Sequence, residues 1–127
     1  MVALPLALLT TNLLYINQFP DRKADIVAGK LHWVARFGSD VARWGYPLIT
    51  LVAWLVFLLL ILSGLLPTIA LIAILPLPLT VKAAQLMLRY PAQPQRLAPA
   101  IRMTIAAMLM HGTLLSIALV YSGITSR

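Results

Sequence analysis

Four long apolar stretches make up most of this 127-residue chain, and they restrict it to folds that a lipid bilayer can solvate. Hydrophobic residues account for 61% of the sequence and charged residues for only 10%, which is more apolar surface than a soluble core of this size can bury. A bilayer core of about 30 Å is crossed by roughly 20 helical residues. The expected fold class is therefore an all-α membrane protein with about four transmembrane helices. The spans are expected at residues 2–18, 46–66, 67–90 and 98–121, within a single membrane domain covering residues 1–127.

Prolines predict where two of these helices bend. Pro76 and Pro78 interrupt the third span and predict a kink near residues 72–75. Pro20 cannot donate a backbone hydrogen bond, so the first helix is expected to kink or end there. The segment from about residue 19 to residue 43 is then expected to be a polar loop that carries the functional residues.

Basic residues gather on one side of the predicted topology. Five lie between the first and second spans, and four lie around the connection between the third and fourth spans. These are Arg22, Lys23, Lys30, Arg36, Arg43, Lys82, Arg89, Arg96 and Arg102; Arg127 is expected at the opposite face. The positive-inside rule makes the basic side cytoplasmic. We therefore expect a multi-pass integral membrane protein, in the cell membrane if the source is bacterial, that contacts lipid and does not bind nucleic acid.

An amide and two carboxylates occur at four-residue spacing at the end of the first apolar stretch. Asn17, Asp21 and Asp25 would share one face of a helix, and two of the chain's three acidic residues are in this short motif. Three oxygen donors in a row suit a hard cation such as Mg²⁺. Lys30 and Arg36 follow closely and are placed to bind diphosphate oxygens. The alternative is that these charges are merely solvated, as charges flanking membrane helices often are.

The string from Asn17 to Gly38, N-Q-F-P-D-R-K-A-D-I-V-A-G-K-L-H-W-V-A-R-F-G, resembles the second aspartate-rich motif of the UbiA-type membrane prenyltransferases. It looks closest to the branch that prenylates dihydroxynaphthoate. The resemblance implies a helical bundle in which two aspartate-rich motifs hold Mg²⁺ and an isoprenyl diphosphate. The isoprenyl group then passes to an aromatic acceptor in quinone-type biosynthesis.

Transferred by position, this resemblance assigns roles to five residues. Asn17, Asp21 and Asp25 would be metal ligands, and the two aspartates the catalytic residues. Lys30 and Arg36, together with Asn17, would contact the diphosphate.

The chain departs from the family pattern in three ways. Pro20 stands where the family often has Arg, and Arg22 is the expected replacement for that phosphate contact; His32 also stands where smaller residues are common. No second N/D-x-x-x-D motif occurs in the sequence, since Asp40 stands alone.

The resemblance therefore covers only the C-terminal part of a family member. The first motif is expected either from a longer chain or from a partner chain, unless the chain is an inactive remnant. The competing hypothesis is a non-catalytic membrane subunit or an assembly protein.

Three residues within the spans have structural explanations. His111 is expected to be a neutral imidazole bonded to a neighbouring helix, although an ionisable residue at membrane depth is also a functional candidate. Trp54 is expected to be a packing residue. Lys82 either extends to the headgroups or lines the active cavity.

Overall fold

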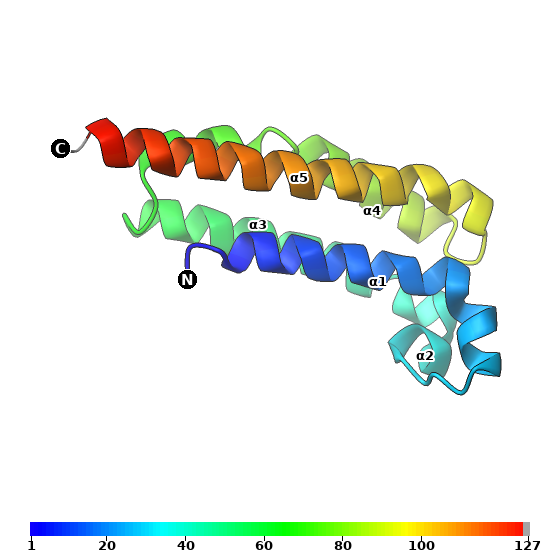
Figure 1. Ribbon diagram of the computed structural model, residues 1–127. Helices are drawn as coiled ribbons and strands as arrows, with labels where there is room; N and C mark the ends of the chain where they lie inside the picture. Colours follow the sequence, from blue (N-terminus) through cyan, green and yellow to red (C-terminus); the bar gives the residue numbers. More distant parts are fainter. Residues whose placement is uncertain (126–127) are drawn as a thin grey trace.

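The computed structural model describes residues 1–125 and shows an elongated bundle of long helices (Figure 1). The elements in chain order are α1 (Leu4–Val27), α2 (Trp33–Ala42), α3 (Gly45–Leu62), the 3₁₀ helix η1 (Thr68–Ile74), α4 (Leu77–Arg89) and α5 (Pro94–Thr125). Residues 1–125 contain no strand, which confirms the all-α fold class.

Within residues 1–125, three segments are long and apolar enough to cross a membrane: Gly45–Leu62, Thr68–Arg89 and Pro94–Thr125. They correspond to the second, third and fourth predicted spans. The first predicted span forms most of α1, which packs against α3 and α5 as the fourth long helix of the bundle. Polar residues such as Thr10, Thr11 and Asn12 distinguish α1 from the three apolar segments.

The segment predicted as a polar loop at residues 19–43 is mostly helical instead. α1 continues through Pro20 to Val27, and α2 fills most of the remainder. Figure 1 shows that the last part of α1 turns away from the axis of the rest, so the helix bends without ending. A proline removes one backbone hydrogen bond and displaces the preceding turn, and a helix with good tertiary contacts on both sides survives that loss as a kink.

The third span is divided as the prolines predict. Its first part is the 3₁₀ helix η1, which ends at Ile74, and α4 begins at Leu77. The imidazole Nδ1 of His111 lies 2.8 Å from the carbonyl oxygen of Ala73 and donates a hydrogen bond to it. Pro76, three residues after Ala73, has no N–H to offer that carbonyl. His111, on the neighbouring helix, therefore provides the hydrogen bond that the Ala73 carbonyl lacks at the break, as expected for a buried histidine bonded to a neighbouring helix.

Buried side chains form two apolar clusters joined by a polar layer. One cluster, at the end where α1 finishes and α3 begins, comprises Ile16, Phe19, Val34, Ala42, Tyr46, Ala83, Met87, Leu97 and Ala100. The other, toward the opposite end, comprises Phe57, Leu60, Leu66, Ala70, Ala73, Leu115 and Ala118.

Hydrogen bonds in the polar layer tie three helices together. The amide of Asn12 donates to the Thr50 hydroxyl at 2.7 Å and to the Tyr46 carbonyl at 3.2 Å. The Tyr46 hydroxyl lies 2.6 Å from the Thr104 hydroxyl. These contacts link α1, α3 and α5, and they fix how α1 is rotated in the bundle. Trp54 also packs here, with its indole N–H donating to Thr80 at 2.9 Å.

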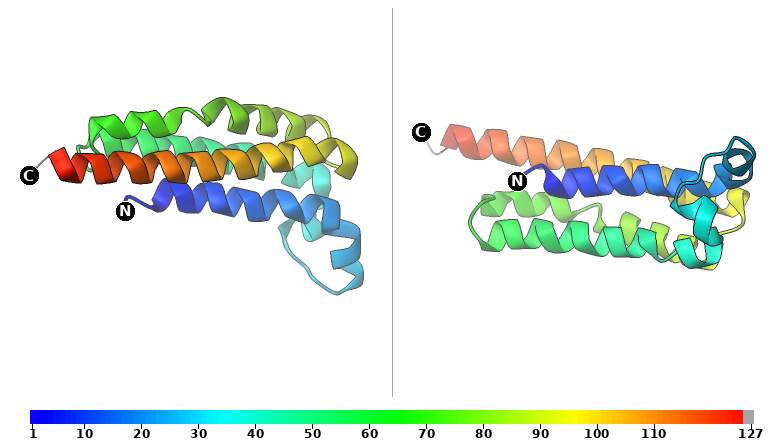
Figure 2. Two further views of the ribbon diagram at one scale, coloured as in Figure 1. Left: turned by 45° about the horizontal axis from the view of Figure 1, so that its top comes forward. Right: turned by 90° about the horizontal axis from the view of Figure 1, so that it is seen from below.

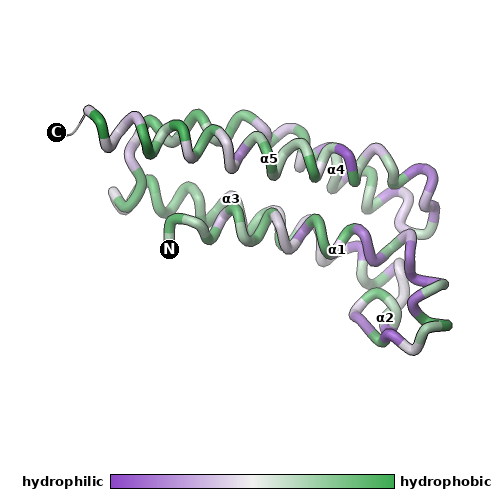
Figure 3. The backbone as a smooth tube through the Cα atoms, viewed as in Figure 1, coloured by the Kyte–Doolittle hydropathy of each residue, from purple (hydrophilic) through white to green (hydrophobic). Residues whose placement is uncertain are grey.

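The two ends of the bundle differ in polarity. The end of α1, all of α2, and the connection between α4 and α5 lie together at one end, which we call the basic end (Figures 1 and 2). Hydrophilic positions gather there, whereas the opposite half is mostly hydrophobic (Figure 3). The predicted clustering of basic residues on one side therefore corresponds to one end of the molecule, while Arg127 lies outside the described residues.

Candidate functional site

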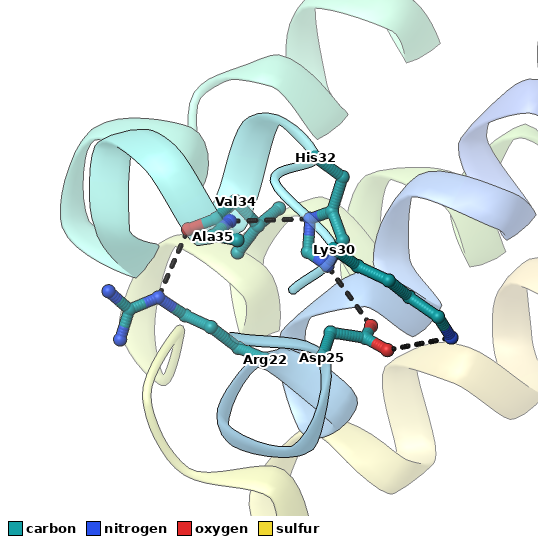
Figure 4. Close-up of polar contacts among 6 residues, drawn as sticks. All are labelled: Arg22, Asp25, Lys30, His32, Val34 and Ala35. Carbon is teal, nitrogen blue, oxygen red and sulfur yellow. Dashed lines mark hydrogen bonds and ion pairs between the residues drawn. The ribbon is translucent and has the colours of Figure 1, made fainter. Parts of the chain in front are cut away.

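Asp25 is the centre of a polar corner formed by the last turns of α1 and the start of α2 (Figure 4). Lys30 Nζ lies 3.1 Å from its Oδ1, and His32 Nε2 lies 3.0 Å from its Oδ2. The hydrogen bond from Lys30, followed by that from His32, lowers the pKa of the Asp25 carboxyl below its ordinary value. The lowered pKa keeps this carboxylate ionised at neutral pH, and the two hydrogen bonds hold the side chain, which is only 17% exposed, in a defined position.

His32 connects this carboxylate to the first turn of α2. Its Nδ1 accepts a hydrogen bond from the backbone N–H of Ala35 at 3.2 Å, which makes His32 the N-cap of α2. An Nδ1 that accepts leaves the proton of a neutral ring on Nε2, and that N–H donates to Asp25. From the sequence, His32 was noted because smaller residues are common at that position in the family. The available signal was its place just before a helical segment, but histidine is not among the common N-cap residues.

Arg22 supports the same corner from the neighbouring position on α1. Its Nε donates to the carbonyl oxygen of Val34 at 3.0 Å (Figure 4). Val34 is fully buried in the cluster at the basic end. Arg22 and Asp25 therefore both fasten the start of α2 to α1, so Arg22 has a structural role in addition to the phosphate contact predicted for it.

The other predicted ligands do not complete a metal site at this corner. Asp21 and Arg36 are exposed, and Asn17 is half-buried one turn before Asp21 on α1. Within residues 1–125, no three histidine, cysteine, aspartate or glutamate residues come together in a way that could hold a metal ion. Both oxygens of Asp25 are already bonded to cationic or N–H donors. The three predicted ligands have the oxygen chemistry that magnesium prefers, but they form at most part of a coordination shell.

A small basic cavity lies on the other side of α1. It has a volume of about 150 Å³ and lies between α1, α2 and the α4–α5 connection. Its lining is Phe19, Pro20, Arg22, Lys23, Ser39, Ala92 and Pro94. With about 3.6 residues per helical turn, positions 19 and 23 fall roughly opposite positions 17 and 21. Lys23 therefore lies on the opposite face of α1 from Asn17 and Asp21, whereas Arg22 lines this cavity and also supports the Asp25 corner.

An apolar groove runs between α3 and α4 within the membrane-spanning part. Its volume is about 320 Å³, and its lining is Pro47, Thr50, Leu51, Trp54, Leu77, Val81, Ala84, Gln85 and Leu88. Almost all of this lining is apolar, which suits a hydrocarbon chain rather than a charged ligand.

Comparison with known proteins identifies the family. The model described as the UbiA prenyltransferase family matches residues 1–108, a range that includes all of α1 to α4 and every predicted site residue. No match was found among curated proteins or among solved structures. The family match and the helical membrane fold agree with the motif at residues 17–38, and we conclude that the chain belongs to the UbiA prenyltransferase family.

Proposed function

We propose that this chain provides the diphosphate-binding end of a UbiA-type prenyltransferase. The reaction is transfer of an isoprenyl group from its diphosphate to an aromatic acceptor. Membership of the family supports prenyl transfer in general. The motif resemblance supports the narrower proposal that the acceptor is a dihydroxynaphthoate-like ring in quinone-type biosynthesis.

The observation that carries the proposal is the corner formed by Asp25, Lys30 and His32. The Lys30 ammonium is 68% exposed and lies 3.1 Å from a carboxylate that is 17% exposed. A diphosphate has several anionic oxygens that can bind the same ammonium. Lys30 can therefore leave Asp25 and bind the diphosphate when a substrate arrives. We assign Arg36, an exposed residue of α2, to the same anion, which a guanidinium can bind in a bidentate manner.

Magnesium is part of the proposed function. Asn17, Asp21 and Asp25 would contribute oxygen ligands to it, and the remaining ligands would come from a first aspartate-rich motif outside these 127 residues, on the same polypeptide or on a partner chain. When bound, the ion would neutralise diphosphate charge and favour departure of the leaving group. The protein's own contribution is to hold the ionised Asp25 at a fixed position, and to provide Lys30 and Arg36 for the diphosphate.

The apolar groove between α3 and α4 supplies a slot for the isoprenyl chain in this proposal. Its lining is almost entirely hydrocarbon, and it lies within the apolar part of the bundle. A chain seated there would keep its carbon tail out of water while its diphosphate reached the basic end.

The first prediction tests the two aspartates. In nanodiscs, the purified chain should bind geranyl diphosphate more tightly with Mg²⁺ than without it, and Asp21→Ala and Asp25→Ala should each weaken the Mg²⁺-dependent binding by at least about tenfold, a loss of about 1.4 kcal/mol. Isothermal titration calorimetry measures the affinity for geranyl diphosphate with and without Mg²⁺. Asp40→Ala is the matched control, since Asp40 is an exposed aspartate of α2 outside the motif, and it should bind like the unmodified chain. Unchanged binding in both motif variants would contradict the proposal.

A second candidate function is a non-catalytic membrane subunit. It is favoured by the engagement of both Asp25 oxygens within the chain, and by the lack of a three-ligand metal cluster among residues 1–125. It predicts no Mg²⁺-dependent binding by the unmodified chain and full tolerance of Asp21→Asn. The same titrations therefore distinguish the two functions.

A further inference from the structure

Two arginines at the connection between α4 and α5 contact the ring of one tyrosine. The guanidinium carbon of Arg89 lies 5.7 Å from the centre of the Tyr90 ring, and that of Arg96 lies 4.8 Å from it. Arg89 ends α4, whereas Arg96 is in the first turn of α5. The shared ring, which attracts cations, therefore holds two positive charges from different helices close together. We call these three residues the arginine–tyrosine cluster.

Backbone hydrogen bonds in the connection bring the cluster together. The N–H of Gln93 donates to the carbonyl oxygen of Tyr90 at 3.1 Å, and the N–H of Arg96 donates to the carbonyl oxygen of Gln93 at 3.0 Å. Two successive tight turns thus return the chain toward the ring that precedes them. Leu97, the next residue, is fully buried in the apolar cluster at the basic end, so the turns are anchored to the core.

The positive charge of the cluster is not balanced within residues 1–125. The sequence has three acidic residues, and all of them lie on α1 or α2. The ion pairs of the described residues are those of Asp25, so neither Arg89 nor Arg96 has a carboxylate partner there. Arg96 also lies at the end of α5 where the helix carries partial positive charge, and the first turn of α5 contains no acidic residue. Three sources of positive charge meet here, and an anion from outside the chain would stabilise all of them.

The location of the cluster points to a phosphate at the membrane surface. α4 and α5 belong to segments that are apolar enough to span a membrane, and their connection lies at the tip of the basic end (Figures 1 and 2). Both arginines are exposed there, at the level where spanning helices meet lipid headgroups. A guanidinium binds phosphate oxygens in a bidentate manner, and a phosphate has enough oxygens for two guanidiniums.

We propose that Arg89, Tyr90 and Arg96 form a binding site for the phosphate group of an anionic lipid. The two guanidiniums bind the phosphate oxygens, and the Tyr90 ring positions them. The site uses none of the residues assigned to magnesium or to the diphosphate. The inference therefore does not depend on prenyl transfer, and it rests on the shared ring and on the unpaired charges.

Native mass spectrometry of the purified chain in detergent tests the proposal. Phosphatidylglycerol or phosphatidylcholine is added in a concentration series, and the lipid-bound fraction gives an apparent Kd for each. We expect phosphatidylglycerol to bind more tightly, and Arg89→Gln/Arg96→Gln to weaken its binding by at least about tenfold. Arg102→Gln is the control for loss of charge, since Arg102 is an exposed arginine of α5 outside the cluster, and it should bind like the unmodified chain.

The tyrosine gives a second test that leaves the charge unchanged. Tyr90→Phe keeps the aromatic face and should retain phosphatidylglycerol binding. Tyr90→Leu removes that face and should weaken binding toward the level of the double arginine variant. Thermal denaturation of each variant in detergent establishes that it is folded.

Three results would overturn the inference. Unchanged phosphatidylglycerol binding by both the double arginine variant and Tyr90→Leu would mean that the arginines serve another partner, such as a carboxylate of another chain. Equal weakening by Arg102→Gln would mean that net charge alone attracts the lipid. Displacement of bound phosphatidylglycerol by excess inorganic phosphate would identify a soluble phosphate, and not a lipid, as the ligand.

Discussion

Single residues decide how closely the helices of this bundle approach. Gly45 begins α3 directly against the ring of Tyr15 on α1. A β-carbon at position 45 would collide with the Tyr15 hydroxyl, whose O–H donates to the Ala42 carbonyl at 2.6 Å. The absence of a side chain at this position is what allows α1 and α3 to meet at the basic end.

We predict that Gly45→Ala destabilises the protein by about 1–3 kcal/mol, because the tyrosine ring must leave its place and lose its hydrogen bond. Thermal denaturation in detergent, followed by intrinsic fluorescence, measures the change. Gly123→Ala is the matched control, since nothing lies within 4 Å of the new methyl group on α5. A Gly45→Ala variant that melts with the control would show that α1 and α3 are not held together at this point.

At the scale of elements, the corner between α1 and α2 depends on two separable contacts of His32. Its Nδ1 caps α2, and its Nε2 binds Asp25. Asparagine is a good N-cap but is too short to span the second contact. We predict that His32→Asn keeps α2 helical yet loosens it from α1, whereas His32→Ala also loses the cap, at a further cost of about 1 kcal/mol.

Hydrogen exchange of the peptide covering residues 33–42 distinguishes the two variants. His32→Asn should show exchange intermediate between the unmodified chain and His32→Ala. Equal protection in all three proteins would mean that the buried residues of α2, and not its cap, hold the element in place.

The same elements show how far sequence reasoning reached. The apolar runs predicted the long helices to within a few residues at most ends, because a bilayer demands both length and hydrophobicity. Pro20 did not by itself predict whether the helix would bend or end. The helix continues because the buried Phe19 and the Arg22–Val34 hydrogen bond stabilise it on both sides of the proline. The segment containing α2 was predicted to be a polar loop because it is short and charged, and its backbone is indeed non-helical at Gly38 (φ 78°), within the ten residues of α2.

At the candidate site, the sequence singled out individual residues but not the hydrogen bonds that join them. Asp25 and Lys30 were singled out, and they form an ion pair. The link through His32 required knowing that α2 folds back onto the end of α1. The titrations above test the role predicted for Asp21.

For the whole molecule, the asymmetry between its ends yields a prediction about orientation. If the positive-inside rule applies, the basic end faces the cytoplasm. Because the sequence has no cysteine, a single introduced thiol reports its side of the membrane without background. In intact bacterial cells, an impermeant maleimide should label Ser63→Cys, at the exposed end of α3, and should label Gln95→Cys only after permeabilisation. The reverse pattern would place the candidate site outside the cell.

The polar layer that ties α1 to its neighbours also constrains how α1 can present its side chains to a ligand. Turning α1 about its long axis would swing Asp21 toward a new partner, but it would also tear Asn12 from Thr50 and Tyr15 from Ala42. The orientation of the Asp21 carboxylate about the α1 axis is thus set about two helical turns away, by contacts inside the bundle. A ligand must adapt to that orientation, and any change that breaks those distant contacts would redirect Asp21 without touching it.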